Sequence, residues 1–153
     1  MRFSIVLFST SWILFLIFAD KKKIPLYIST CYTAVILAFI TDLLMVTRPL
    51  WEYPVRVKEH LFWIEMMNAF GIYFVTTFLF LQLLPQKQTI LRMTRHIFYW
   101  STFAILIEYL ALKVGFIKHQ MWWNLGWSYL SDGILFTFFY AHYKWSNKYF
   151  KQS

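Results

Sequence analysis

The chain has 153 residues, of which 59% are hydrophobic, 23% are aromatic and only 14% are charged. Soluble domains carry about 45–50% apolar and about 25% charged residues. A soluble protein of this size has too little interior to hide so much apolar surface. The composition therefore excludes an ordinary soluble domain and indicates an integral membrane protein.

The net charge of +8 does not indicate nucleic-acid binding, because the basic residues form no single patch. They fall in short clusters between apolar runs, at 21–23, 48–58, 87–95 and 144–151. This is the pattern of membrane-flanking loops, where cations meet lipid headgroups and set the orientation of the chain. We therefore expect the lipid bilayer as a partner and no nucleic acid.

Five segments are long and apolar enough to cross the hydrocarbon core, which takes about 20 residues of helix. We expect one all-α domain over 1–153, an integral membrane bundle of five transmembrane helices at about 3–19, 25–46, 65–84, 97–117 and 122–143. Only Arg2 precedes the first apolar run and three lysines close it. This favours an uncleaved helix over a signal peptide.

The segment 48–64, between the second and third predicted helices, mixes aromatic and charged residues. Pro49 and Pro54 prevent a continuous helix early in this segment. We expect a short interfacial segment along the outer membrane surface, with a solvated loop as the alternative.

The distribution of Lys and Arg predicts the orientation. With five crossings, the loops at 21–23 and 86–96 and the C-terminal tail share one side and hold nine Lys and Arg residues, against six on the other side. Short loops rich in Lys and Arg stay in the cytoplasm. The sequence therefore predicts a multi-pass protein of the cell membrane with its N-terminus outside and its C-terminus cytoplasmic.

Two carboxylates, Glu108 and Asp132, fall in the middle of the fourth and fifth predicted helices. A turn near position 120 brings them to the same depth, roughly 15–18 Å of helix from the turn. Intramembrane charges usually face a bundle interior or water. Asp42, Glu65 and Asn68 lie in the same outer half, so we expect these five residues to form a candidate intramembrane polar site.

A purely structural interpretation stands beside this one. Buried acids can stay protonated and lock helices together by hydrogen bonds. Asp42 would then pair with Arg48, and the other acids would bond nearby hydroxyl groups, of which the candidates are Ser101, Thr102, Ser128 and Ser131. With no cation expected beside Glu108, we also expect Glu108 or Asp132 to be protonated.

No catalytic residue, metal or cofactor is expected. The four histidines fall at the ends of the predicted segments, so none is expected beside the acids, and neither HExxH nor GxSxG occurs. The single cysteine, Cys31, rules out an internal disulfide and a thiolate metal cluster. Cys31 lies in an apolar run and is expected to be a packing residue.

Two blocks carry a resemblance to a known family. They are PLYIST (25–30) with TDL (41–43), and YWSTFAILIEYLALKVGF (99–116) with Trp122 and Trp123. Together they resemble an uncharacterised family of small multi-pass membrane proteins from endospore-forming Gram-positive bacteria. The resemblance covers most of the chain and includes Asp42 and Glu108. It implies location and topology but no activity.

The interpretation favoured by the sequence is a non-enzymatic accessory or partner-binding component of a bacterial membrane. Its partner would be another membrane protein or a second copy of the chain. Two alternatives stay open. One is a small ion or proton conduit that uses the intramembrane carboxylates, and the other is an enzyme that modifies a lipid or an isoprenoid with two carboxyl groups as acid and base.

Overall fold

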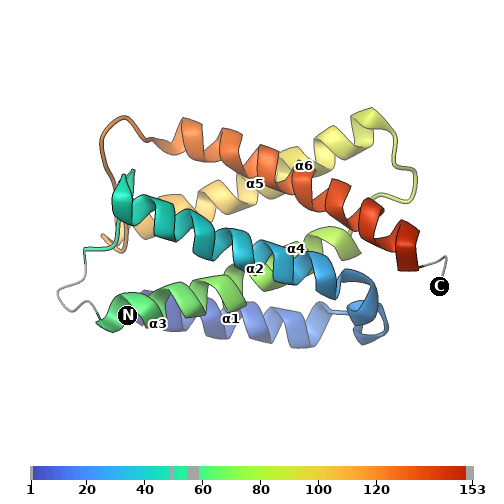
Figure 1. Ribbon diagram of the computed structural model, residues 1–153, viewed down its shortest axis with the longest axis horizontal. Coiled ribbons are helices and arrows are strands. Elements are labelled where there is room, and N and C mark those ends of the chain that lie inside the picture. The colour runs from blue at the N-terminus through green and yellow to red at the C-terminus, as the bar shows by residue number, and fades with distance from the viewer. Residues whose placement is uncertain (1, 49, 55–58, 151–153) are drawn as a thin grey trace.

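The computed structural model describes residues 2–48, 50–54 and 59–150. In this part of the chain, five helical rods run up and down in sequence order (Figure 1). The rods are α1 (Arg2–Phe18), α2 (Ile24–Thr47), the continuous run of α3 (Glu59–Met67), η2 (Asn68–Tyr73) and α4 (Phe74–Gln82), then α5 (Ile90–Lys113) and α6 (Leu125–Phe150). A 3-10 turn, η1 (Lys21–Lys23), precedes α2. The all-helical class predicted from the sequence is confirmed.

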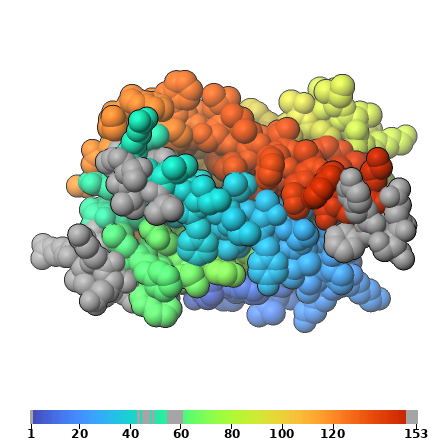
Figure 2. Space-filling view, viewed as in Figure 1, coloured from blue at the N-terminus to red at the C-terminus, as the bar shows by residue number. Residues whose placement is uncertain are grey.

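The third rod, α3–η2–α4, lies between α1 and α2, while α2 also packs against α6, and α6 against α5. Figure 2 shows α2 and α6 side by side on one face. The π-helical turn η2 approaches α1 closely at Gly71. A Cβ at this position would lie 2.9 Å from Cδ2 of Phe8, so glycine is required for this contact.

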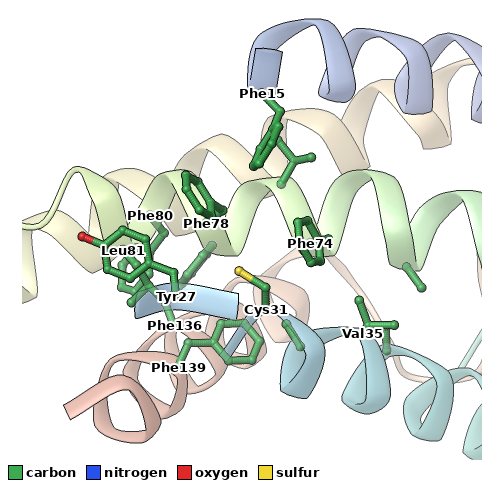
Figure 3. Packing of buried hydrophobic residues seen from close by; sticks show 14 residues of the cluster. Phe15, Tyr27, Cys31, Val35, Phe74, Phe78, Phe80, Leu81, Phe136 and Phe139 are labelled. Atoms are coloured by element: carbon green, nitrogen blue, oxygen red, sulfur yellow. The ribbon is translucent and has the colours of Figure 1, made fainter. Parts of the chain in front are cut away.

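Aromatic rings fill the core at the level of α4 (Figure 3). Phe78 and Phe80 of α4 are at most 1% exposed, and they contact rings from α1, α2, α5 and α6. Cys31 of α2 is fully buried among them with a free thiol. Its predicted role as a packing residue is confirmed.

A two-stranded ribbon closes one end of the bundle. Strand β1 (Trp51–Glu52) pairs antiparallel with β2 (Lys118–His119), with Trp51 opposite His119. The backbone N–H of Gln120 also donates to the carbonyl of Leu50 over 2.7 Å. Residues 50–52 are therefore tied to the loop after α5, which the sequence did not predict, whereas residues 59–64 already belong to α3. Positions 49 and 55–58 lie outside the described residues. We call this end of the bundle the ribbon end. The opposite end, which carries η1, is called the lysine end.

The predicted boundary of the fourth helix is wrong, because α5 ends at Lys113 and not near 117. Gly115 adopts a φ of 69°, and its N–H donates to the carbonyl of Leu112. The N–H of Phe116 donates to the carbonyl of Ala111. These two bonds form a Schellman motif, which ends the helix although the apolar sequence continues.

The start of the fourth helix is also displaced from 97 to Ile90, because the first turns of α5 carry Arg92 and Arg95 and were assigned to a loop. The fifth helix covers Leu125–Phe150 rather than 122–143. Asn124 sets its start, because its side-chain oxygen accepts from the backbone N–H groups of Gly126 and Trp127. This is the hydrogen bonding of an N-cap residue.

Two helical stretches among the described residues are long and apolar enough to cross a membrane by length and composition, Lys21–Asp42 and Leu61–Gln82. Helix α1 is apolar but has only 17 residues. Helices α5 and α6 are longer, with 24 and 26 residues, and include charged residues near their ends.

Candidate functional site

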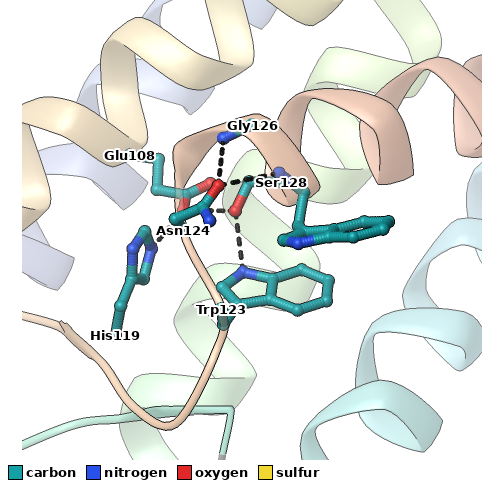
Figure 4. A network of polar contacts seen from close by, with 7 residues as sticks. Glu108, His119, Trp123, Asn124, Gly126 and Ser128 are labelled. Carbon is teal, nitrogen blue, oxygen red and sulfur yellow. Dashed lines mark hydrogen bonds and ion pairs between the residues drawn. The ribbon is translucent and has the colours of Figure 1, made fainter.

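Glu108 lies at the centre of a polar network at the ribbon end (Figure 4). Its Oε1 atom is 2.6 Å from Nε2 of His119 and accepts a 2.6 Å hydrogen bond from Oγ of Ser128. The indole N–H of Trp123 donates to the same serine oxygen over 2.8 Å. One carboxylate oxygen thus joins α5, the β2 strand and α6.

His119 lies beside Glu108, whereas the sequence predicts no histidine beside the acids. It was assigned to the end of a predicted helix, whereas it lies in β2 with its side chain 15% exposed. The expectation that no histidine lies beside Glu108 is therefore wrong. Ser128, one of the predicted hydroxyl partners, is confirmed as a partner of Glu108.

The depth predicted for the two central acids is also wrong. Glu108 lies five residues before the last residue of α5, and Asp132 seven residues after the first residue of α6. At 1.5 Å per residue, they are about 7–11 Å inside the helix ends rather than near the middle of the bundle. The eleven residues from Val114 to Asn124, predicted to be mostly helix, account for the difference.

Asp132 and Glu108 are near enough for their charges to interact. Their predicted sharing of one pocket stays a prediction. Ser101, about two turns before Glu108 in α5, is 1% exposed, and its hydroxyl has no hydrogen-bond partner among the described residues. A Cβ on Gly133 would lie 3.9 Å from this hydroxyl, so Ser101 faces the part of α6 next to Asp132.

The other predicted residues gather around two tyrosines that sequence reasoning missed. Asp42 of α2 and Glu65 of α3 are near enough to interact with each other. Tyr53, which follows β1, interacts with both carboxyl groups, and Tyr73 of η2 interacts with Asp42 and also with Asp132 and Glu108. The two tyrosines thus lie near acids of four helices. We call Asp42, Glu65, Asn68, Tyr53 and Tyr73 the acid–tyrosine cluster.

Tyr53 is held in place by two contacts. Its ring lies 5.3 Å from that of Phe116, and its hydroxyl accepts a 3.3 Å hydrogen bond from Nδ2 of Asn68. Burial, followed by the charge of Asp42, raises the pKa of Tyr53 well above its usual range. Its phenol therefore stays neutral at physiological pH, with a proton to donate.

The predicted pair of Asp42 with Arg48 is not among the ion pairs of the described residues. Arg48 directly follows the last residue of α2 and its side chain is exposed. The side chain within hydrogen-bonding reach of Asp42 is instead that of Trp51 in β1. The ribbon therefore contacts Asp42 through Trp51. The Trp51 ring also packs against the Trp123 ring, with the two ring centroids 5.4 Å apart.

The lysine end carries polar contacts of a different kind. His142 of α6 bridges two hydroxyl groups of α2, with Nδ1 2.9 Å from Thr30 Oγ1 and Nε2 3.3 Å from Thr33 Oγ1. His96 of α5 contacts the carbonyl oxygen of Phe80 at 3.0 Å. These hydrogen bonds join neighbouring helices. The aromatic core lies between these bonds and the acids of the ribbon end.

The side chains of the ribbon end determine the chemistry that is available there. The Ser128 hydroxyl donates its hydrogen bond to Glu108 and not to His119. The three side chains therefore lack the serine–histidine hydrogen bond that activates a nucleophile. Within the described residues, no three His, Cys, Asp or Glu side chains are placed to hold a metal ion. Carboxylates, a carboxamide and phenols remain, which recognise cations and hydrogen-bond donors.

Comparison with protein families, with curated proteins and with solved structures found no match to this chain.

Proposed function

We propose that this chain is an integral membrane protein with five crossings, which acts without catalysis as a binding component of a bacterial membrane. The observation that carries the proposal is the apolar surface of the rods. Large apolar side chains are exposed on every rod, among them Ile13 on α1, Ile36 on α2, Trp63 on α3, Leu106 on α5 and Ile134 on α6, each 55–62% exposed. Such a surface is stable in lipid and unfavourable in water.

Two helical stretches, Lys21–Asp42 and Leu61–Gln82, are long and apolar enough to cross a membrane, and the proposal extends the crossing to all five rods. Rods of 17 to 26 residues reach about 25–39 Å, which is close to the thickness of the hydrocarbon core. The lysine and arginine residues of α5 lie in its first turns and at its last residue, and those of α6 include Lys144 and Lys148 near its end. Long basic side chains near helix ends extend to the interface at little cost.

The uneven distribution of polar groups favours binding over conduction. A conduit needs polar groups or water along its whole length. Here the acids within the helices lie toward the ribbon end, and the rings of Phe78, Phe80 and Phe136 fill the core between α4 and α6 toward the lysine end. A polar site open to one side of the membrane suits a ligand or a partner from that side, either another membrane protein or a second copy of the chain.

The proposed orientation places the ribbon end outside and the lysine end in the cytoplasm, following the excess of Lys and Arg at the lysine end. We expect the protein to stay in membranes washed with alkaline carbonate. A fluorescent protein fused after residue 153 should be bright, and alkaline phosphatase at the same place should be inactive. Extraction by carbonate would contradict the membrane assignment, and an active phosphatase would reverse the orientation.

A further inference from the structure

An unsatisfied acceptor lies in the acid–tyrosine cluster. The Asn68 side chain is only 7% exposed, and its Nδ2 donates to Tyr53, but its Oδ1 has no hydrogen-bond partner among the described residues. An unpaired buried acceptor costs about 1–3 kcal/mol. Asn68 is the first residue of the π-helical turn η2, and such turns often occur at functional sites.

The neighbouring acids also lack a counter-charge in the described part of the chain. The ion pairs found there are Lys23 with Asp20 at the lysine end and His119 with Glu108. Asp42 and Glu65 are partly buried and near enough to interact unfavourably as like charges. A cation bound between them would remove this repulsion.

The groups around this position fit an ammonium group better than a metal ion. Asp42, Glu65 and Oδ1 of Asn68 provide three acceptors, and a primary ammonium carries three N–H donors. Three aromatic side chains lie near Asp42, those of Trp51, Tyr53 and Tyr73, and aromatic faces attract organic cations. A divalent metal would instead require a tighter shell of oxygen ligands.

We infer that the acid–tyrosine cluster binds a primary ammonium group that approaches from the ribbon end. This inference rests on the proposed function and names the chemistry of its ligand. Two sources carry such a group, the headgroup of an ethanolamine lipid and a free amine. Tyr73 is 38% exposed on the third rod, so one member of the cluster lies at the surface of the bundle.

The test uses the purified full-length protein in nanodiscs of phosphatidylglycerol. Calorimetry should detect binding of ethanolamine hydrochloride, and tetramethylammonium, which has the charge without the N–H donors, should bind about tenfold more weakly. Native mass spectrometry of protein from mixed bilayers should show retained phosphatidylethanolamine if the source is lipid. Binding of free ethanolamine without lipid retention would identify a soluble amine.

Variants locate the site. Asp42→Asn and, where that variant does not fold, Glu65→Gln should weaken ethanolamine binding by about tenfold or more. Asp20→Asn is the matched control, because Asp20 is an exposed acid at the lysine end and asparagine keeps its capping oxygen. Its affinity should equal that of the unaltered protein.

Three outcomes would overturn the inference: no binding of either ethanolamine form, equal weakening by Asp20→Asn, or binding of Ca²⁺ or Mg²⁺ that excludes ethanolamine. A protein that resists carbonate extraction and binds no amine would refute this inference alone. Extraction by carbonate would refute the proposed function whatever the amine result.

Discussion

Replacing Glu108 with alanine should destabilise the protein by about 3 kcal/mol and detach the loop after α5 from the bundle. The variant loses two hydrogen bonds of 2.6 Å, to His119 and Ser128. Hydrogen bonds to charged groups contribute about 1.5–3 kcal/mol each, and bonds to a shared atom sum to less than the two separate values. The Ser128 hydroxyl and the partly buried His119 imidazole would also lose their acceptor.

Limited trypsin digestion would detect the detached loop, because Lys113 directly precedes this loop and Lys118 lies within it. Both lysine side chains are exposed. We expect faster cleavage at both lysines in Glu108→Ala, together with a lower unfolding midpoint in detergent. Glu52→Gln is the control, since Glu52 is an exposed residue of β1 whose side chain takes no part in the hydrogen bonds that join Glu108, His119 and Ser128. Unchanged cleavage and stability in Glu108→Ala would show that the Glu108 network does not hold the ribbon.

A lysine in the middle of α2 should strongly reduce the amount of inserted protein. Ile36 is 56% exposed near the centre of α2, so Ile36→Lys would place a charge in hydrocarbon. Insertion scales give a cost of about 2.5–3.5 kcal/mol for such a charge. In a water-soluble protein, the same exposed substitution would change stability by at most about 0.5 kcal/mol.

The control for this substitution is Leu91→Lys. Leu91 is 80% exposed but lies in the first turn of α5, where a lysine side chain extends to the interface. Carbonate-resistant protein, measured by quantitative immunoblot, should fall for Ile36→Lys and stay unchanged for Leu91→Lys. Equal amounts of the two variants would mean that the α2 surface faces water.

The five rods were predictable because their apolar runs are long and separated by charged or proline-containing segments. The end of α5 was not, because Val114, Phe116 and Ile117 continue the apolar pattern beyond the helix. What ends the helix is the backbone of Gly115, and a single glycine in an apolar run is a weak signal. Lys113 before this glycine and His119 after it were the available hints of a C-cap followed by a loop.

The site was predictable in composition but not in geometry. The predicted helix ends place Asp42, Glu65 and Asn68 on one side of the bundle. All three lie near Tyr53, and Asp42 also lies near Tyr73, which is compatible with that placement. His119 was missed because it lies eleven residues after Glu108, in strand β2, which is positioned by its pairing with β1. Pairing between segments so far apart in sequence leaves no local pattern to find.

The central claim is that the bundle spans the membrane with its ribbon end outside, and labelling of single cysteines tests it most directly. In a Cys31→Ala background, cysteine would replace Lys118 at the ribbon end, Lys22 at the lysine end, or Ile36 between them. A membrane-impermeant maleimide should label Lys118→Cys in intact cells, Lys22→Cys only after permeabilisation, and Ile36→Cys in neither case. Labelling of Ile36→Cys as fast as Lys118→Cys would contradict the membrane-spanning account, and early labelling of Lys22→Cys would contradict the orientation.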